Sequence, residues 1–224
     1  MPNLLIFGST GTLGGAILDK YREEGWKISC AVRKVVNDSD MQLPLTSSQL
    51  SGKSFNAVVF AQGANVNGSA MQTGTAELNE LFEANVVVIA ESISTLMGQG
   101  AIVEGGHVAI LSSLWEQFTR QEKFAYSVTK AAVGGLVRSL AVDLGRQKKI
   151  LVNGILPGII NSPMVARTLS PEQVANVLGQ TPGGELASPV DVANSVFMFA
   201  SSLNTGISGQ SIFVDRGFSI ARTI

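Results

Sequence analysis

Residues 3–14 read NLLIFGSTGTLG, an apolar run followed by three glycines at intervals of three. The run predicts a buried strand over 3–8, and the segment behind it predicts an amphipathic helix over 13–24. A helix start with free amides attracts a pyrophosphate, and glycines let the phosphate approach the backbone closely. The turn therefore predicts a dinucleotide site; the alternative is a tight turn that holds no ligand. The residues that would hold the dinucleotide are Gly8, Ser9, Thr10, Gly11, Thr12, Leu13 and Gly14.

Beyond the glycine turn, apolar runs of strand length alternate with helix-length segments to the end of the sequence. This alternation predicts a mostly parallel sheet with helices on both faces, because the crossover between parallel strands is right-handed. We expect a single-domain, doubly wound α/β Rossmann fold over residues 1–224, with about seven strands. The expected strands are 3–8, 26–32, 41–45, 55–61, 106–111, 150–156 and 211–214. The expected helices are 13–24, 76–97, 124–146 and 189–201.

Two stretches are hard to assign. The segment 34–52 should contain a strand and a helix but offers only the short apolar run at 41–45. The segment 161–187 contains three prolines and a Gly-Gly pair, so we expect a loop with short helical pieces. We interpret this second segment as an insertion that helps to form a substrate pocket.

The composition is that of a globular chain that leans apolar: 45% of the 224 residues are hydrophobic and 15% are charged. A net charge of −1 gives no basic field for nucleic acid or for an anionic membrane. The opening residues MPNLLIFG lack the basic region of a signal peptide, and no apolar stretch reaches the roughly 20 residues of a membrane span. A single cysteine, Cys30, excludes an internal disulfide. We therefore expect a soluble, cytoplasmic protein with no metal site.

The end of the second expected strand bears on which dinucleotide is bound. It reads Ala31-Val32-Arg33-Lys34, with two cations and no carboxylate before Asp38. A carboxylate there would accept hydrogen bonds from the ribose hydroxyls of NAD, whereas a guanidinium pairs with the 2′-phosphate of NADP. Arg33 lies 19 residues beyond Gly14, close to the ~20 typical of that position. Arg33 and Lys34 therefore favour NADP(H); the alternative is a solvated basic strand end.

The stretch 125–145, AYSVTKAAVGGLVRSLAVDLG, contains candidate catalytic side chains. Tyr126 and Lys130 are spaced i, i+4, which places both on one face of a helix. Ser113 lies thirteen residues before Tyr126, at the end of the apolar run HVAILSS, and Asn85 lies in the preceding helix. An ammonium beside a phenol favours the phenolate, so we expect Lys130 to lower the pKa of Tyr126 from its ordinary value near ~10.

Together with the segment VNGILPGIINSP that follows, these residues resemble the classical short-chain dehydrogenase/reductase family, in particular its 3-oxoacyl-acyl-carrier-protein reductases. The resemblance covers nearly the whole chain. It implies a catalytic triad of Ser113, Tyr126 and Lys130, with Asn85 as fourth member. It also implies that Ala61, Gln62 and Gly63 lie beside the adenosine. The residues that it implies hold the nicotinamide carboxamide are Pro157, Gly158, Ile160 and Ser162.

The chain departs from the family's pattern in three places. Its glycine turn is spaced G-x-x-G-x-x-G, as in atypical members, where the classical spacing is G-x-x-x-G-x-G. Ala61 and Gln62 stand where asparagines are usual. The acidic residue that commonly meets adenine at the third strand is replaced within Leu43-Pro44-Leu45, so we expect a rudimentary strand and different adenine contacts there.

The resemblance implies an NADP(H)-dependent oxidoreductase that reduces a carbonyl (a ketone, an aldehyde or a 3-oxoacyl thioester) to an alcohol by hydride transfer. Negative charge then develops on the substrate oxygen, to which Ser113 and Tyr126 can donate hydrogen bonds. Two alternatives are an NAD(H)-linked secondary-alcohol dehydrogenase and a non-catalytic NADP-binding sensor; the intact triad argues against the sensor. The expected partners are a small-molecule carbonyl or alcohol substrate and further copies of the chain, in a homodimer or homotetramer.

Overall fold

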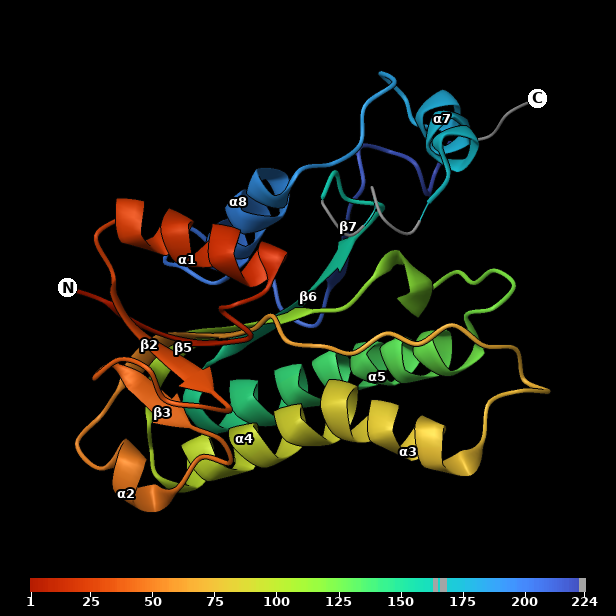
Figure 1. Ribbon diagram of the computed structural model, residues 1–224. Helices are drawn as coiled ribbons and strands as arrows, with labels where there is room; N and C mark the ends of the chain where they lie inside the picture. The colour runs from red at the N-terminus through yellow and green to blue at the C-terminus, as the bar shows by residue number, and fades with distance from the viewer. Residues whose placement is uncertain (163–164, 166–168, 222–224) are drawn as a thin grey trace.

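A computed structural model gives the structure of residues 1–162, 165 and 169–221. Its centre is a seven-stranded sheet in the order β3-β2-β1-β4-β5-β6-β7 (Figure 1). Every neighbouring pair of strands runs parallel, which confirms the predicted doubly wound fold. The strands are β1 (Asn3–Phe7), β2 (Lys27–Val32), β3 (Asp40–Gln42), β4 (Phe55–Phe60), β5 (Ile102–Leu111), β6 (Leu151–Pro157) and β7 (Ser211–Val214).

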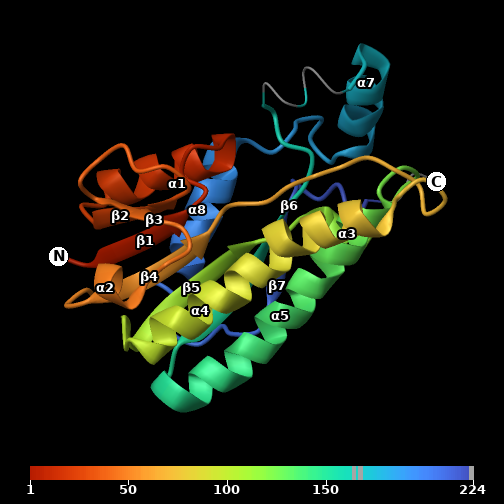
Figure 2. The same ribbon diagram turned by 60° about the horizontal axis from the view of Figure 1, so that its bottom comes forward.

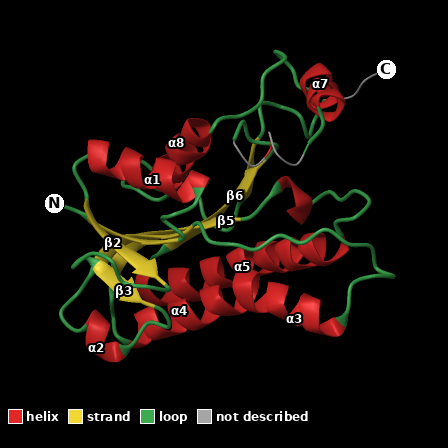
Figure 3. Cartoon of the chain, in the orientation of Figure 1, coloured by secondary structure: helices red, strands yellow, loops and turns green. Residues whose placement is uncertain are grey.

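Helices connect the strands along the chain, as Figure 3 shows by element type. They are α1 (Thr12–Glu23), α2 (Ser47–Leu50), α3 (Thr75–Phe82), α4 (Val88–Gly98), α5 (Phe124–Lys148), α7 (Pro171–Gln180) and α8 (Pro189–Phe199). A π-helical turn over Glu83–Val87 joins α3 to α4, and a 3-10 turn over Leu114–Glu116 follows β5.

The helices cover both faces of the sheet (Figure 2). α1 and α8 lie against one face, and α3, α4 and α5 lie against the other. Because alternate residues of a strand point to opposite faces, β1 sends Leu4 and Ile6 into the first layer and Leu5 and Phe7 into the second. All four are fully buried, which explains why the strand sequence is apolar throughout.

The two segments that the sequence left open contain short elements. In 34–52, β3 has three residues and α2 has four, too few for a periodic pattern to stand out. In 161–187, α7 has Ser170 as its N-cap, whose side chain accepts a hydrogen bond from the Gln173 amide in a capping box. The Ser-Pro-x-Gln signature of this start is visible in the sequence. The remainder of the expected substrate loop lies partly outside the described residues.

Residues Thr75–Gly98 form one helical stretch of 24 residues, where a single helix over 76–97 is expected. By length and composition alone this stretch qualifies as a membrane span, which corrects the expectation that no part of the chain does. Its residues Ile89, Ile93 and Leu96 are buried in the layer shared with α5 and the sheet. These three apolar side chains therefore serve the core of this fold.

Packing requires two of the three glycines in the β1–α1 turn. Gly8 has φ +75°, a conformation that favours glycine, and a Cβ on it would lie 2.5 Å from the Gln62 amide nitrogen. A Cβ on Gly14 would overlap the carbonyl oxygen of Gly8. Gly11 is different: it stands at the N-cap of α1, and a Cβ there would make an ordinary contact at 3.6 Å.

The beginning and the end of the chain meet in the layer formed by α1 and α8. The buried Tyr21 hydroxyl donates a hydrogen bond of 2.8 Å to the carbonyl oxygen of Ala200. The Tyr21 ring also makes edge contacts with Trp26 and Phe197. Burial raises the pKa of Tyr21 far above its ordinary value, so this hydroxyl acts as a permanent donor within the core.

Candidate active site

The residues singled out in the sequence collect at the carboxyl ends of the strands, where open parallel sheets bind their ligands. The glycine turn follows β1, Gln62 follows β4, and Ser113 follows β5. Tyr126 and Lys130 come from the first two turns of α5, which packs beside the 3-10 turn that Ser113 caps. The topology therefore brings together segments that are more than a hundred residues apart in the sequence.

Lys130 is buried, with 3% of its surface exposed, and its ammonium donates a hydrogen bond of 3.2 Å to the Leu111 carbonyl oxygen. The Nζ atom lies 5.6 Å from the centre of the Tyr126 ring, as the i, i+4 spacing predicts. Burial lowers the pKa of Lys130 to about 8, and the Glu116 carboxylate acts in the opposite direction. The ammonium therefore keeps its proton at neutral pH.

Ser113 and Tyr126 place two hydroxyl groups next to each other. Burial raises the pKa of Tyr126, and a hydrogen bond with the Ser113 side chain lowers it in part. The Ser113 Oγ also accepts a hydrogen bond of 3.3 Å from the Trp115 amide, which fixes its direction. The expectation that Lys130 lowers the Tyr126 pKa below its ordinary value is wrong for this structure, because the loss of water around the phenol has the larger effect.

Asn85 lies in the π-helical turn, 1% exposed, and its side chain is fully engaged. The Oδ1 atom accepts from the Ala64 amide at 2.8 Å, and the Nδ2 atom donates to the Ala64 carbonyl and to Thr129 Oγ1, both at 3.0 Å. Thr129 in turn donates to the Tyr126 carbonyl oxygen. Asn85 thus clamps the loop after β4 to the α5 turn that carries Tyr126 and Lys130.

The loop after β4 lies between the glycine turn and this cluster. A Cβ on Gly63 would lie 3.2 Å from the Asn85 Oδ1 and 3.5 Å from the Lys130 Nζ. The side-chain amide of Gln62 is buried, and neither its nitrogen nor its oxygen has a hydrogen-bond partner among the described residues. A buried amide that lacks partners is costly, so Gln62 marks a place where a polar ligand is expected.

The turn after β6 contributes mainly backbone. Pro157 ends β6, and the Gly158 amide donates a 3.1 Å hydrogen bond to the Val214 carbonyl oxygen. The side chain of Ile160 lies in the core cluster beneath α8, so any contact from Ile160 to a ligand would come from its backbone. The Ser162 hydroxyl accepts a hydrogen bond of 3.4 Å from the Val165 amide.

At the outer end of the site, Arg33 and Lys34 follow β2 directly and are exposed. Neither takes part in the ion pairs found within the described part of the chain. The amide groups at the start of α1 have no capping side chain, because Gly11 occupies the N-cap. This end of the sheet therefore offers free backbone donors and two unpaired cations.

Two charged residues of the site were missed by the sequence interpretation. The Glu116 carboxyl packs against α5, where a Cβ on Gly134 would lie 2.6 Å from its Cδ, and its Oε2 is buried with no hydrogen-bond partner among the described atoms. Lys123 is 6% exposed, and its Nζ lies 5.2 Å from the centre of the Tyr126 ring. The spacing of Lys123 and Tyr126, three residues apart, is the signal that could have found it.

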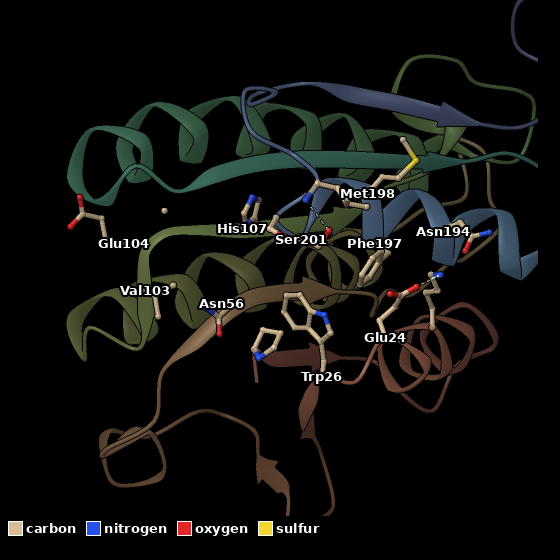
Figure 4. Close-up of a pocket in the computed structure, with 15 residues that line it drawn as sticks. Glu24, Trp26, Asn56, Val103, Glu104, His107, Asn194, Phe197, Met198 and Ser201 are labelled. Carbon is tan, nitrogen blue, oxygen red and sulfur yellow. Dashed lines mark hydrogen bonds and ion pairs between the residues drawn. The ribbon is translucent and has the colours of Figure 1, made fainter.

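A separate cavity of about 710 Å³ lies at the amino ends of the strands (Figure 4). Trp26, Phe197 and Met198 form its apolar part, beside Asn56 and His107. Its volume suits a small molecule. Its described lining contains none of the sequence-predicted site residues, which lie at the opposite end of the sheet.

Comparison with known proteins gives consistent matches. A protein-family profile described as enoyl-(acyl carrier protein) reductase matches residues 35–219. The 7alpha-hydroxysteroid dehydrogenase of Escherichia coli K12 is 34% identical over 113 residues, which cover 50% of this chain and 44% of that enzyme, or under half its length. Cyclopentanol dehydrogenase of Comamonas sp. is 26% identical over 92% of this chain and 83% of its own. The solved structure of ElxO with NADP bound has a TM-score of 0.81 at 19% identity, covering 97% of this chain and 98% of that one.

Proposed function

Because this chain belongs to the classical short-chain dehydrogenase/reductase family, we propose that it is an NADP(H)-dependent oxidoreductase that reduces a ketone, an aldehyde or a 3-oxoacyl thioester to an alcohol. The observation that carries the proposal is the cluster of buried Ser113, half-buried Tyr126 and buried Lys130 at the carboxyl end of β5. These three side chains are a hydroxyl donor, a proton donor and a cation, which are the groups that carbonyl reduction needs.

The residues at this end of the sheet fit a nicotinamide dinucleotide. The uncapped start of α1 suits its pyrophosphate, and the buried, unpartnered amide of Gln62 suits a polar group beside the loop after β4. Arg33 and Lys34, exposed after β2, would pair with a 2′-phosphate, and the backbone of 157–162 would hold the carboxamide. The preference for NADP(H) rests on Arg33, and ElxO, a protein of the same fold, binds NADP.

The dinucleotide, when bound, supplies the hydride for the carbonyl carbon. Ser113 and Tyr126 donate hydrogen bonds to the carbonyl oxygen and stabilise the negative charge that develops there. Tyr126 then gives its proton to that oxygen. Lys130, protonated below about pH 8, faces the phenolate that is left and stabilises it. Asn85 keeps the loop after β4 and the first turns of α5 in register, so that these groups stay in place.

A second candidate is oxidation of a secondary alcohol with NAD(H). Two relatives favour it, since one is named for a hydroxysteroid and the other for cyclopentanol, which are both cyclic alcohols. The same three residues serve this direction with reversed roles. A non-catalytic NADP sensor of the same fold is a weaker candidate, because cofactor binding alone requires neither Ser113 nor Tyr126.

Tyr126→Phe tests the proposal. The variant keeps the ring but removes the proton donor, so turnover should fall at least ~10²-fold, within the 10²–10⁴ range typical of a general acid, while NADPH binding persists. The assay follows NADPH consumption against ketones, aldehydes and a 3-oxoacyl thioester. Tyr21→Phe is the matched control, because Tyr21 is the other of the two tyrosines and lies in the core. Near-normal turnover in Tyr126→Phe would show that the site is wrongly assigned.

A further inference from the structure

Lys123 is a buried cation that the proposed reaction does not use. It stands at the N-cap of α5, three residues before Tyr126, with 6% of its surface exposed. Its ammonium donates a hydrogen bond of 2.8 Å to the Asn65 Oδ1. An ammonium has three donors, and a buried one is expected to be paired. Yet Lys123 takes part in none of the ion pairs found between the described residues.

The loop after β4 holds Lys123 in place. Gly68 forms an isolated parallel bridge with Lys123. The Gly68 amide donates to the Glu122 carbonyl at 3.1 Å, and the Phe124 amide donates to the Gly68 carbonyl at 3.2 Å. With the Asn65 contact, these bonds fix both the backbone and the ammonium of Lys123. The position of the charge is therefore set by the fold.

The Lys123 ammonium lies over the ring of Tyr126, the residue that the proposed function makes the proton donor. The Lys123 Nζ is 5.2 Å from the ring centre, and the Lys130 Nζ is 5.6 Å from it. Both distances are within the ~6 Å at which a cation is attracted to an aromatic ring. Two ammonium groups, one from the N-cap and one from the second turn of α5, thus lie near one aromatic ring.

The other groups around Tyr126 leave this field largely uncompensated. Ser113, at the end of β5, contributes a neutral hydroxyl. The Glu116 carboxylate of the 3-10 turn acts on Lys130, and Arg120, from the segment before α5, adds positive charge near Lys123. Asn65, from the loop after β4, is a neutral amide. Negative charge that forms on the phenol therefore meets a net positive surrounding.

We propose that Lys123 is a positioning residue of this site: together with Lys130 it places a second positive charge on the Tyr126 ring and stabilises the phenolate that forms in the reaction. The inference rests on the proposed function, and it deepens it by adding a residue outside the family's triad. Lys123 acts through Tyr126 and does not contact the reacting atoms.

Lys123→Met and Lys123→Arg separate charge from shape. A cation near a phenol favours the phenolate, typically by one or more pKa units, so Lys123→Met should lower turnover at neutral pH about tenfold, and Lys123→Arg should restore most of it. In alcohol oxidation, the rise of kcat with pH should lie about one unit higher in Lys123→Met than in Lys123→Arg. Lys20→Met is the matched control, because its Nζ also lies 5.2 Å from a ring, that of Phe197, far from the site.

A purely structural role gives a different result. If Lys123 only tethers the loop after β4, then Asn65→Ala, which breaks the hydrogen bond but keeps the charge, should lower turnover as much as Lys123→Met. We expect a smaller loss in Asn65→Ala and an unshifted pH profile. Equal losses in these two variants, or the same pH profile for Lys123→Met and Lys123→Arg, would overturn the proposal.

A titration of Tyr126 that does not depend on enzyme activity tests the role of Lys123 independently of the proposed function. Tyr126 and Tyr21 are the two tyrosines of the chain, and burial places the pKa of Tyr21 far above the ordinary range. Alkaline titration of tyrosinate absorbance therefore reports Tyr126, and Tyr126→Phe identifies the signal. Arginine stays charged at these pH values, so the midpoint should be about one unit lower in Lys123→Arg than in Lys123→Met. Equal midpoints would refute the electrostatic role even if every variant were inactive.

Discussion

At the scale of single residues, the site is defined by ammonium groups removed from water. Lys130 is nearly inaccessible, and the main-chain oxygen of Leu111 accepts its hydrogen bond. A charge in such a place destabilises the folded state unless it is fully paired. The protein therefore keeps Lys130 charged at the expense of stability, which is the pattern expected of a functional group.

Lys130→Met should make this trade measurable. The folded pKa of about 8 lies below the ordinary lysine value, so between these two pH values the unfolded chain binds more protons than the folded one. Stability of the native protein should therefore rise as pH increases from about 8 to ~10. The variant should lack this rise and be more stable at neutral pH by about 1–3 kcal/mol, while turnover is lost. Urea unfolding at several pH values checks this; a less stable variant at neutral pH would contradict it.

Arg33→Ala addresses the choice of dinucleotide. A guanidinium bonded to a 2′-phosphate contributes on the order of 1.5–3 kcal/mol, so the variant should lose roughly a tenfold to hundredfold preference for NADPH over NADH. Affinity for NADH should change little, since it lacks the phosphate. Fluorescence titration with both dinucleotides gives the ratio. An unchanged ratio would show that Arg33, exposed after β2, does not read the phosphate.

At the scale of elements, the sequence shows which segments form the site but not how they are fastened together. The spacing of Tyr126 and Lys130 is a local property of α5, so it predicts their contact directly. The clamp of Asn85 on Ala64 and Thr129 depends on the π-helical turn, which no periodic pattern announces. The same holds for Lys123, whose partner Asn65 is 58 residues away in the sequence.

The β1–α1 turn allows a paired test at this scale. Gly14→Ala should destabilise the protein by about 2–3 kcal/mol, because its Cβ would overlap the Gly8 carbonyl oxygen. Gly11→Ala should cost less than about 1 kcal/mol, since the Cβ meets that oxygen at 3.6 Å. Gly11→Ala should nevertheless weaken NADPH binding, because the added methyl group stands where the pyrophosphate is expected. Thermal unfolding and dinucleotide titration separate the two effects; equal loss of stability in both variants would contradict them.

At the scale of the whole molecule, the sequence predicts the layers and the strand connections well. Alternating apolar runs and right-handed crossovers leave few other arrangements, and the parallel sheet confirms them. The weakest part of that prediction concerns β3 and α2, which draw their order from the neighbouring β2 and from caps. Such short elements depend on tertiary contacts, which a single sequence does not display.

The face formed by α4 and α5 leads to a prediction about assembly. Phe124, Val128 and Val142 on α5 are between 37% and 52% exposed, and α5 lies beside α4 on one face of the sheet (Figure 2). We expect this face to pair across a two-fold axis in a homodimer or homotetramer. Val128→Glu should lower the mass measured by light scattering, and Met71→Glu, at a residue 95% exposed in a loop, should not. A monomeric native protein at micromolar concentration would contradict the prediction.

The bond between Tyr21 and Ala200 also has a consequence for how the chain is made. The two residues are separated by 179 positions in the sequence, so the layer of α1 and α8 cannot close until α8 has been synthesised. Until then the apolar side of α1, which includes Tyr21 and Ile17, is not covered by α8. Chains that depend on contacts between residues distant in sequence fold slowly and expose aggregation-prone apolar surface during folding. Nascent chains that end before α8 should therefore expose this apolar surface and be bound by chaperones or degraded by proteases.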